Sequence, residues 1–247
     1  LRFVQDVASL NFWQNDSGVA GLPIVGDTVV FPEDSGTVIL DRPTAELTAL
    51  TVSSGTTLFT TNWTTAIRAQ TMTVADGGTV TCAGPFSDRY TEAYQNIDMS
   101  NRVWIVCGAL NVEQGGTITA DGKGYGEPGG LSASATRAYG PGGTASKLCG
   151  GAHGGIGQKY GSGVALKTAY DSLSAPTLPG SSGGTSSGAV SAGGGVIRIE
   201  ATGTVALDGT EEATYSYRDG TPVTQVTVRI VSGVVPSWSK PTHSPAS

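Results

Sequence analysis

The chain has 247 residues and a net charge of −6 at pH 7, and only 14 % of its residues are charged and 38 % hydrophobic. Average globular domains have roughly 25 % charged and 45–50 % apolar residues, and 37 glycines fill much of the difference here. This composition excludes a broad helical core and favours thin, repetitive β structure. The basic residues are scattered, so we expect no nucleic-acid partner, and no apolar run approaches the ~18 residues of a membrane span.

One pattern recurs five times along the chain: an alternating apolar strand, a polar turn with glycine, and a second alternating strand. The copies read VVFPEDSGTVILD, LTVSSGTTLFT, MTVADGGTVTCAG, LNVEQGGTITADG and IRIEATGTVALDG, and they start at Val29, Leu50, Met72, Leu110 and Ile197. Consecutive starts lie 21, 22, 38 and 87 residues apart. The two short spacings suit one coil of a β-solenoid, in which each coil buries its inward side chains only when the next coil stacks on it.

The longer spacings indicate insertions into this repeat. The 38-residue spacing fits one coil plus an insert over 85–100, and the 87-residue spacing is close to four coil lengths and contains a glycine-rich region. We therefore predict an all-β fold, a right-handed parallel β-helix (β-solenoid) with a glycine-rich inserted lobe. A β-sandwich is the alternative, because a flat antiparallel meander shows the same period-two alternation.

The predicted organisation is a single β-solenoid domain over 1–235, with inserts at 85–100 and 123–192, and a Pro/Ser-rich tail over 236–247. The glycine-rich region includes DGKGYGEPGG, CGGAHGGIGQKYGSG and SAGGG. A flexible linker is one interpretation of such a glycine-rich sequence. The tyrosines and other large side chains that interrupt it favour a compact lobe of extended, polyproline-II-like runs packed side by side.

Aromatic residues in the first insert and in the glycine-rich region are the candidate binding residues. On the surface they would form a stacking platform for a ligand, and the alternative is that they pack against the solenoid. The candidates are Phe86, Tyr90, Tyr94, Tyr125, Tyr139 and Tyr160.

We predict no catalytic residue, no metal ligand and no cofactor, because the sequence has no metalloprotease, P-loop or Cys-x-x-Cys motif. His153, which lies among glycines, is interpreted as a turn residue. Structural Ca²⁺ at the acidic loops 32–36 and 208–212 is the alternative for a cofactor.

A polysaccharide-cleaving β-helix is the enzymatic alternative, and it would need two suitably spaced carboxylates. Aspartates that precede glycine are already explained by turn chemistry. The carboxylates at outward or turn positions are Asp76, Glu113, Asp121, Glu200 and Asp208.

Three cysteines allow one internal disulfide and one leftover thiol. Cys82 ends one coil and Cys107 begins a strand of the next, so a bridge between them would staple adjacent coils, and Cys149 is the alternative partner of either. Sequons at Asn15 and Asn62 are candidate N-glycosylation sites. With the low lysine content, they are compatible with an extracellular, cell-surface or virion location.

The first coils resemble those of β-helix surface proteins of bacteria and phages. They read FWQNDSGVAGLPIVGDTVVFPEDSGTVILDRPTAELTALTVSSGTTL. A second resemblance is to glycine-rich repeat proteins of cell surfaces and tail fibres. It rests on LNVEQGGTITADGKGYG, the glycine-rich sequence after it, and GGGVIRIEATGTVALDG. The sequence pattern is also similar to that of phage adhesins, which present receptor-binding loops on packed glycine-rich runs. This resemblance of pattern covers most of residues 12–210 and implies a surface or virion module.

We therefore predict a non-enzymatic extracellular structural or adhesive subunit of a filament, fibre or virion surface. The strand-like end segments LRFVQDV and VTQVTVRIVSGVV are expected either to join neighbouring subunits in a homo-oligomer or filament or to cap their own domain. A module that binds a cell-surface glycan or receptor is the second hypothesis, and the polysaccharide-cleaving enzyme is the third.

Overall fold

The computed structural model describes residues 2–4, 12–14, 21–85, 102–126, 139–143, 149–157, 168–172, 177–183, 192–212, 214–215, 223–224 and 227–230. Every regular element among them is a β-strand, so the predicted all-β class is confirmed for this part of the chain. None of these residues belongs to a helix long and apolar enough to cross a membrane.

The larger of the two main sheets has nine strands and collects strands from successive repeats. Its parallel strands are β3 (Thr28–Phe31), β5 (Leu47–Val52), β7 (Ile67–Val74), β9 (Val103–Val112), β11 (Ile197–Ala201), β12 (Val205–Leu207) and β16 (Thr227–Ile230). At one edge, β1 (Arg2–Val4) pairs with β3 in parallel and with β2 (Phe12–Gln14) in antiparallel orientation.

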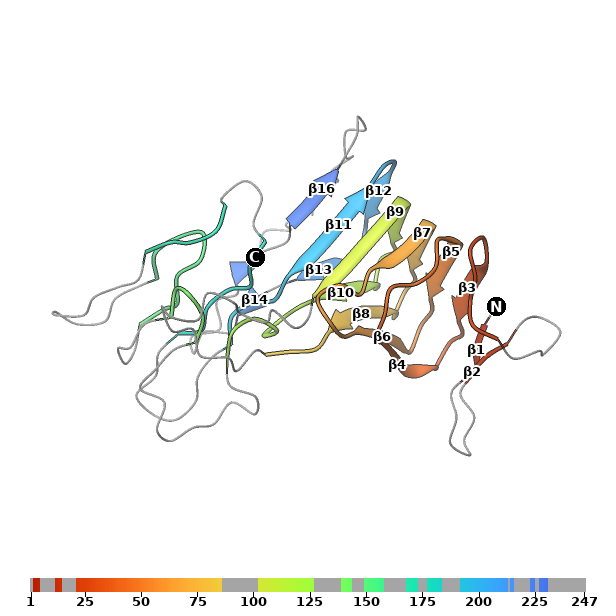
Figure 1. Ribbon diagram of the computed structural model, residues 1–247, viewed down its shortest axis with the longest axis horizontal. Helices are drawn as coiled ribbons and strands as arrows, with labels where there is room; N and C mark the ends of the chain where they lie inside the picture. Colours follow the sequence, from red (N-terminus) through yellow and green to blue (C-terminus); the bar gives the residue numbers. More distant parts are fainter. Residues whose placement is uncertain are drawn as a thin grey trace, which may run out of the picture.

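The second main sheet has five strands, and all of its pairs are parallel. Its strands are β4 (Gly36–Leu40), β6 (Thr56–Thr60), β8 (Thr79–Cys82), β10 (Thr117–Thr119) and β13 (Thr210–Glu212). Two short strands, β14 (Thr214–Tyr215) and β15 (Val223–Thr224), form a separate antiparallel pair. Along the long axis of Figure 1 the chain alternates between the two main sheets, so each pass adds one level to the stack.

The repeat starts found in the sequence lie opposite one another in the larger sheet. Val29 lies opposite Leu50, Leu50 opposite Met72, and Met72 opposite Leu110. The predicted register of the first four repeats is therefore confirmed, including the 38-residue step, which connects the adjacent strands β7 and β9.

Stacked apolar rows from both sheets form one core. The buried rows of the larger sheet are Val29, Leu50, Met72 and Leu110, followed by Phe31, Val52, Val74 and Val112. The facing row of the five-stranded sheet is Val38, Leu58, Val80 and Ile118. Complete burial of one such side chain stabilises the fold by about 1.5–3 kcal/mol, so a chain with few hydrophobic residues gains most of its stability from these rows.

The turns between the two sheets also stack on one another. Gly55 donates its backbone N–H to Gly77 O over 3.2 Å, and Gly77 donates to Gly115 O over 3.1 Å. Gly77 and Gly115 have φ values of +72° and +89°, which L-residues with side chains rarely adopt. A Cβ atom on Gly115 would lie 1.9 Å from Asp76 Oδ1, so the Asp76 side chain would have to move, and the positive φ is the reason that glycine is favoured there.

The predicted alignment of the fifth repeat is wrong. Ile197 lies opposite Val103 rather than Leu110, and Val205 is the residue that lies opposite Leu110. Both apolar runs of IRIEATGTVALDG therefore pair with the ten-residue strand β9, and the matching strand of the five-stranded sheet is Thr210–Glu212. Period-two alternation records which side chains point inward, and it does not record in which sheet a strand lies.

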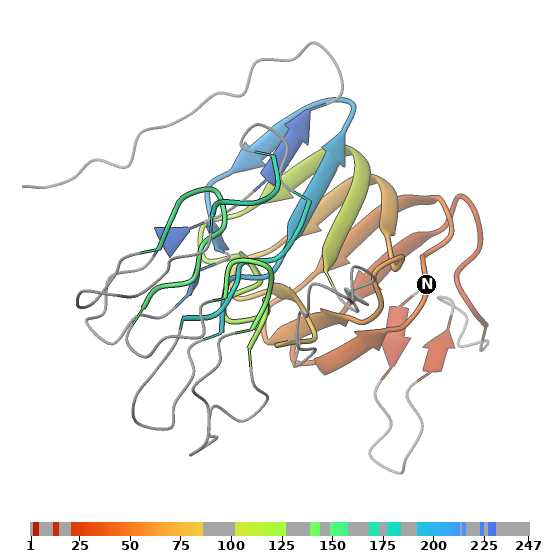
Figure 2. The ribbon, with the colours of Figure 1, turned by 60° about the vertical axis from the view of Figure 1, so that its left-hand side comes forward.

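The 87-residue spacing between the last two repeats is not filled by further coils of the stack. Strand β11 pairs directly with β9, so the 87-residue spacing adds no strand between them in the larger sheet. The glycine-rich region leaves the stack after β10 and returns at β11, as Figure 2 shows.

Both strand-like chain ends pair with the chain's own larger sheet. Arg2 of β1 lies opposite Val30, and β16 pairs along its full length with β11. Strand β1 is thus paired on both sides, by β3 and β2, whereas β16 is paired on one side, by β11. In the sheet order, β2 and β16 are the two outermost strands of the larger sheet among the described residues.

Candidate functional site

The glycine-rich region forms a lobe whose described segments are 122–126, 139–143, 149–157, 168–172, 177–183 and 192–195. Figure 2 shows these segments as extended runs lying side by side next to the strand stack. Backbone hydrogen bonds connect runs that are distant in sequence: Tyr125 N donates to Gly180 O over 3.0 Å, and Gly193 N donates to Tyr125 O over 3.0 Å. The runs are thus held by direct contacts between their backbones.

Glycine allows these runs to approach one another closely. A Cβ atom on Gly193 would lie 2.0 Å from Gly180 O, and one on Gly124 would lie 2.3 Å from Gly194 O. Real Cβ atoms essentially never come so near a carbonyl oxygen, so any larger residue at either position would push two runs apart.

Two of the candidate binding tyrosines lie inside the lobe. Tyr125 is fully buried, and Tyr139 is nearly so. Tyr139 N donates to Ser182 Oγ over 2.6 Å, and Ser182 N donates back to Tyr139 O over 3.0 Å. In this structure the rings of Tyr125 and Tyr139 pack within the lobe, which is the arrangement expected of structural anchors. Phe86, Tyr90, Tyr94 and Tyr160 lie outside the described residues.

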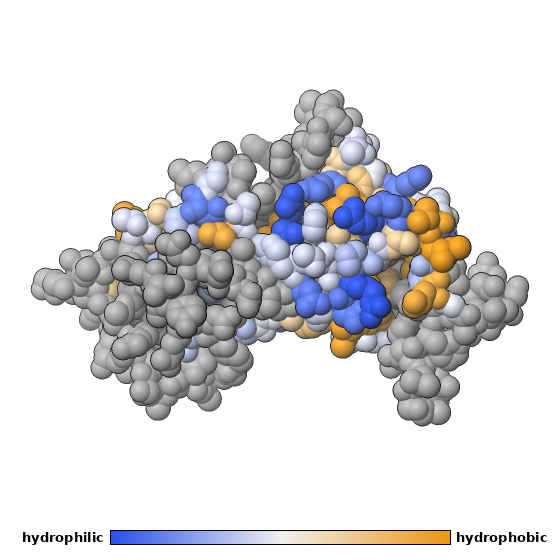
Figure 3. Space-filling model, in the orientation of Figure 1, coloured by the Kyte–Doolittle hydropathy of each residue, from blue (hydrophilic) through white to orange (hydrophobic). Residues whose placement is uncertain are grey.

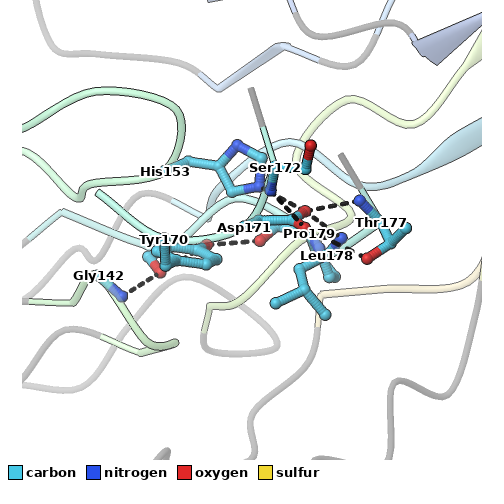
Figure 4. A network of polar contacts seen from close by, with 9 residues as sticks. Gly142, His153, Tyr170, Asp171, Ser172, Thr177, Leu178 and Pro179 are labelled. Atoms are coloured by element: carbon cyan, nitrogen blue, oxygen red, sulfur yellow. Dashed lines mark hydrogen bonds and ion pairs between the residues drawn. The ribbon is translucent and has the colours of Figure 1, made fainter. Parts of the chain in front are cut away.

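A polar cluster around Asp171 closes one loop of the lobe (Figure 4). The Asp171 carboxylate accepts hydrogen bonds from the backbone N–H groups of Ser172, Thr177 and Leu178 over 2.8, 2.6 and 2.7 Å. Asp171 itself has a φ of +67°, a region in which aspartate is tolerated better than most residues. Burial raises the pKa of Asp171, but the three amides and nearby His153 outweigh it, so the net shift is downward.

His153 and Tyr170 complete this cluster. His153 Nε2 lies 3.5 Å from Asp171 Oδ2, and the two side chains are only 11 % and 8 % exposed. The Tyr170 ring meets the His153 ring edge to face, with their centroids 4.7 Å apart.

The Tyr170 hydroxyl extends the network to neighbouring runs. It donates to Pro179 O over 2.6 Å and accepts from Ser181 Oγ over 2.9 Å, and burial raises the pKa of Tyr170. Ser181 Oγ in turn accepts from Gly142 N over 2.8 Å. The network therefore joins three runs of the lobe.

The Asp–His pair has the composition that orients a catalytic imidazole in hydrolases. Here the aspartate already binds three amides of its own loop, and the histidine ring packs against Tyr170. These contacts tie the loop around Asp171 to neighbouring runs of the lobe. Sequence reasoning placed His153 in a turn but missed Asp171, for which the only signal was a short polar residue, in YDS, between glycine-rich runs.

The structure describes all five carboxylates of the enzymatic alternative, and Asp171 is not one of them. Asp76 and Asp121 each precede a glycine with positive φ, as turn chemistry predicts, and Glu200 pairs with Arg198. Within the described residues no three His, Cys, Asp or Glu side chains are grouped so that they could hold a metal ion.

Cys82 and Cys107 are not bridged to each other in this structure. Cys82 and Cys107 are free, buried thiols, and Cys149 is also buried. Cys82 belongs to β8 of the five-stranded sheet and Cys107 to β9 of the larger sheet, and both pack in the apolar core. Burial raises the pKa of Cys82 to about 12 and that of Cys107 to about 11, so both remain protonated at neutral pH.

Of the two sequons, the structure describes the one at Asn62, which is exposed in the turn between β6 and β7. Its side-chain amide donates to Asp41 O over 2.8 Å. Asn15 lies outside the described residues, so glycosylation stays a prediction at both sites.

Comparison of the chain with protein-family models, curated proteins and solved structures found no match. A functional assignment therefore depends on the geometry of this chain alone: a stack of parallel strands, a glycine lobe fixed by backbone contacts, and the surfaces that these two parts leave exposed.

Proposed function

We propose that the chain is a non-enzymatic structural or adhesive module of an extracellular, cell or virion surface, built as a right-handed parallel β-solenoid. The solenoid is supported by the alternation of the chain between two parallel sheets and by the shared register of four repeats. The functional part of the proposal depends on one observation, the exposed apolar side chains of residues 22–25 and of β4 at one end of the stack, called the apolar end.

Large apolar side chains are exposed at this end. Leu22, Ile24, Val25 and Ile39 are between 65 % and 74 % exposed. A hollow of about 390 Å³ lies beside them, and its lining includes Leu22, Ile39 and core residues of the first coils such as Phe31 and Leu50. Figure 3 shows hydrophobic surface gathered at this end, whereas hydrophilic surface covers the middle of the stack.

The strands at this end are suited to end-to-end assembly. Within the described residues β4 pairs only with β6, and β13, at the other end of the same sheet, pairs only with β10. Unpaired strand edges are templates for further pairing, and terminal repeats need a cap. Because every pair in this sheet is parallel, β13 of one copy can continue the sheet at β4 of the next. Repeated head-to-tail contacts of this kind produce filaments.

Light scattering and electron microscopy of the purified chain test this proposal. We expect concentration-dependent oligomers or filaments, because burying the apolar end removes exposed hydrophobic area. The double substitution Val25→Lys and Ile39→Lys should return the chain to a monomer. Gln70→Lys, at an exposed position in the middle strand β7, is the matched control and should leave assembly unchanged.

A wild-type chain that stays monomeric at high concentration would contradict end-to-end assembly. Oligomers that persist in the double variant would contradict the assignment of the interface to the apolar end.

A further inference from the structure

A cluster of arginines and tryptophans lies on the larger sheet. Its centre is the guanidinium of Arg102, whose Cζ lies 4.1 Å from the ring centroid of Trp104 and 4.5 Å from that of Trp63. Trp63 belongs to the connection between β6 and β7, and Arg102 directly precedes β9. The Arg102 cation is therefore in contact with two indole rings contributed by different levels of the stack.

Two further arginines lie near Trp104. Arg198 of β11 lies directly opposite Trp104, with its Cζ 5.0 Å from the ring centroid, and the Cζ of Arg68 of β7 lies 5.9 Å from it. Figure 1 shows β7, β9 and β11 as adjacent strands, so the cluster spans three neighbouring levels.

The charges in this cluster do not balance. Arg68 pairs with Glu46 over 3.3 Å, and Arg198 pairs with Glu200. Arg102, which is only 6 % exposed, forms no salt bridge with any carboxylate among the described residues. Burial and the repulsion of Arg198 outweigh the attraction of Glu200 and lower the pKa of Arg102 to about 10, which still leaves it charged at neutral pH.

Two buried donors of the cluster are also unsatisfied. Arg102 Nε and Trp104 Nε1 have no hydrogen-bond partner among the residues that the structure describes. The backbone of Arg102 is held in place, because its carbonyl accepts a hydrogen bond from the buried Thr60 Oγ1 over 2.9 Å. A buried cation that forms no direct salt bridge is costly, and an anion that pairs with it lowers that cost.

The chemistry of stacked arginine defines the ligand. A guanidinium with its face on an aromatic ring keeps its N–H donors in the plane, where they match the two oxygens of a carboxylate. The half-buried rings of Trp63 and Trp104 leave apolar surface beside this cation. A carboxylate with apolar C–H groups next to it fits both features, and an acidic sugar has them.

We propose that the cluster of Trp63, Arg102 and Trp104, with Arg68 and Arg198 beside it, binds the carboxylate of an acidic saccharide. Arg102 forms the ion pair and the indole rings contact the sugar. This inference goes beyond the proposed scaffold function and holds whether or not the chain assembles end to end.

Tryptophan fluorescence and calorimetry with oligogalacturonate test the site, with a neutral galactose oligomer, sodium sulfate and polyglutamate as comparison ligands. We expect saturable binding of oligogalacturonate that weakens with added salt and little response to the other three. Arg102→Gln should weaken binding about tenfold or more, since a charge-assisted hydrogen bond is lost. Arg42→Gln removes an exposed arginine elsewhere and is the matched control that should change nothing.

Arg102→Gln removes a buried side chain, so circular dichroism must first show that this variant folds. Trp63→Leu, which changes a residue in a turn, is the second variant and should weaken oligogalacturonate binding severalfold by removing the ring contact. Wild-type binding in both folded variants would overturn the proposal, as would failure of the wild-type chain to bind oligogalacturonate. An equal response to polyglutamate would overturn the assignment to a sugar, and an equal response to sulfate would show that the planar carboxylate is not what is recognised.

Discussion

The strand stack and the glycine-rich lobe pack their neighbouring segments together in opposite ways. In the stack, rows of apolar side chains such as Leu50 and Met72 fill the space between two sheets. In the lobe, backbones pack directly against one another at glycines such as Gly193, and a few polar side chains lock the runs. A chain with little hydrophobic content thus uses side-chain rows where its strands are regular and glycine contacts where they are not.

The comparison shows that the two parts should respond to different substitutions. Removing side-chain volume damages the stack, because the neighbouring levels cannot close the cavity completely. Adding side-chain volume damages the lobe, because the runs are already in contact. Four predictions follow from this difference, in order of decreasing effect.

The largest effect is expected for Leu50→Ala in the stack. Leu50 is buried in the row between Val29 and Met72, and its truncation should lower the free energy of unfolding by about 2–5 kcal/mol. Thr51→Ala, at the outward-facing neighbour, is the matched control and should change it by about 0.5 kcal/mol or less. Urea unfolding monitored by circular dichroism measures both. Equal effects would contradict the inward row.

A smaller, local effect is expected for Gly124→Ala in the lobe. The new Cβ would meet Gly194 O at 2.3 Å, so the runs must separate at a cost of about 1–3 kcal/mol. Gly155→Ala is the control, because no atom lies within 4 Å of a Cβ built there. Hydrogen exchange should show faster exchange of lobe amides in the first variant only, with the strands of the stack unaffected. Loss of protection in the stack would show that the two parts unfold together.

Acid should loosen the lobe through Asp171. Its pKa in the folded chain lies below the ~3.9 of an unfolded aspartate, so its charged form stabilises the lobe. That contribution is present above the unfolded pKa and is lost as the pH falls through the lowered folded pKa. Asp171→Asn should cost about 1 kcal/mol at neutral pH and flatten the acid dependence of lobe hydrogen exchange below pH 4. Asp208→Asn, at an exposed turn position, is the control and should keep the wild-type profile.

The smallest effect is expected in the reactivity of the three native cysteines toward a thiol reagent. Cys82 and Cys107 are buried in the stack and Cys149 in the lobe, so none should react quickly with a thiol reagent in the folded chain. All three should react in urea. Near the start of the unfolding transition Cys149 should react first, because the lobe lacks the apolar rows. Mass spectrometry of labelled peptides measures the order, and a disulfide between Cys82 and Cys107 in the purified chain would contradict their free thiols.

Much of the stack could be predicted from the sequence because its signals are local and periodic. Alternation within about eleven residues shows which side chains of a strand point inward, and the constant spacing of Val29, Leu50 and Met72 aligns one strand with the next. The same reasoning misplaced Ile197, since two strands of one sheet and two strands of facing sheets produce the same alternation.

The sites could not be predicted because their partners are distant in the sequence. His153 and Asp171 meet only when glycine runs fold back on each other, and glycine carries no side-chain pattern from which that return can be read. The cluster on the larger sheet shows the same limit. Its members Trp63, Arg102 and Arg198 come from separate repeats and share no local sequence pattern, and only the register of the stacked strands brings them into contact. A signal was present in arginines and tryptophans at the ends of apolar runs, as in RVW and IRI.

The sequence by itself determined the all-β class, the coil length and the inward rows, because burial of alternating apolar side chains requires stacked strands. Tertiary structure alone decided that β11 follows β9 directly, that the lobe leaves between these two levels, and that an unpaired arginine lies between two indole rings. The physical reason is one of distance along the chain. Periodic local patterns specify which face of a strand is buried, whereas contacts across 40 or 90 residues depend on how the whole chain closes.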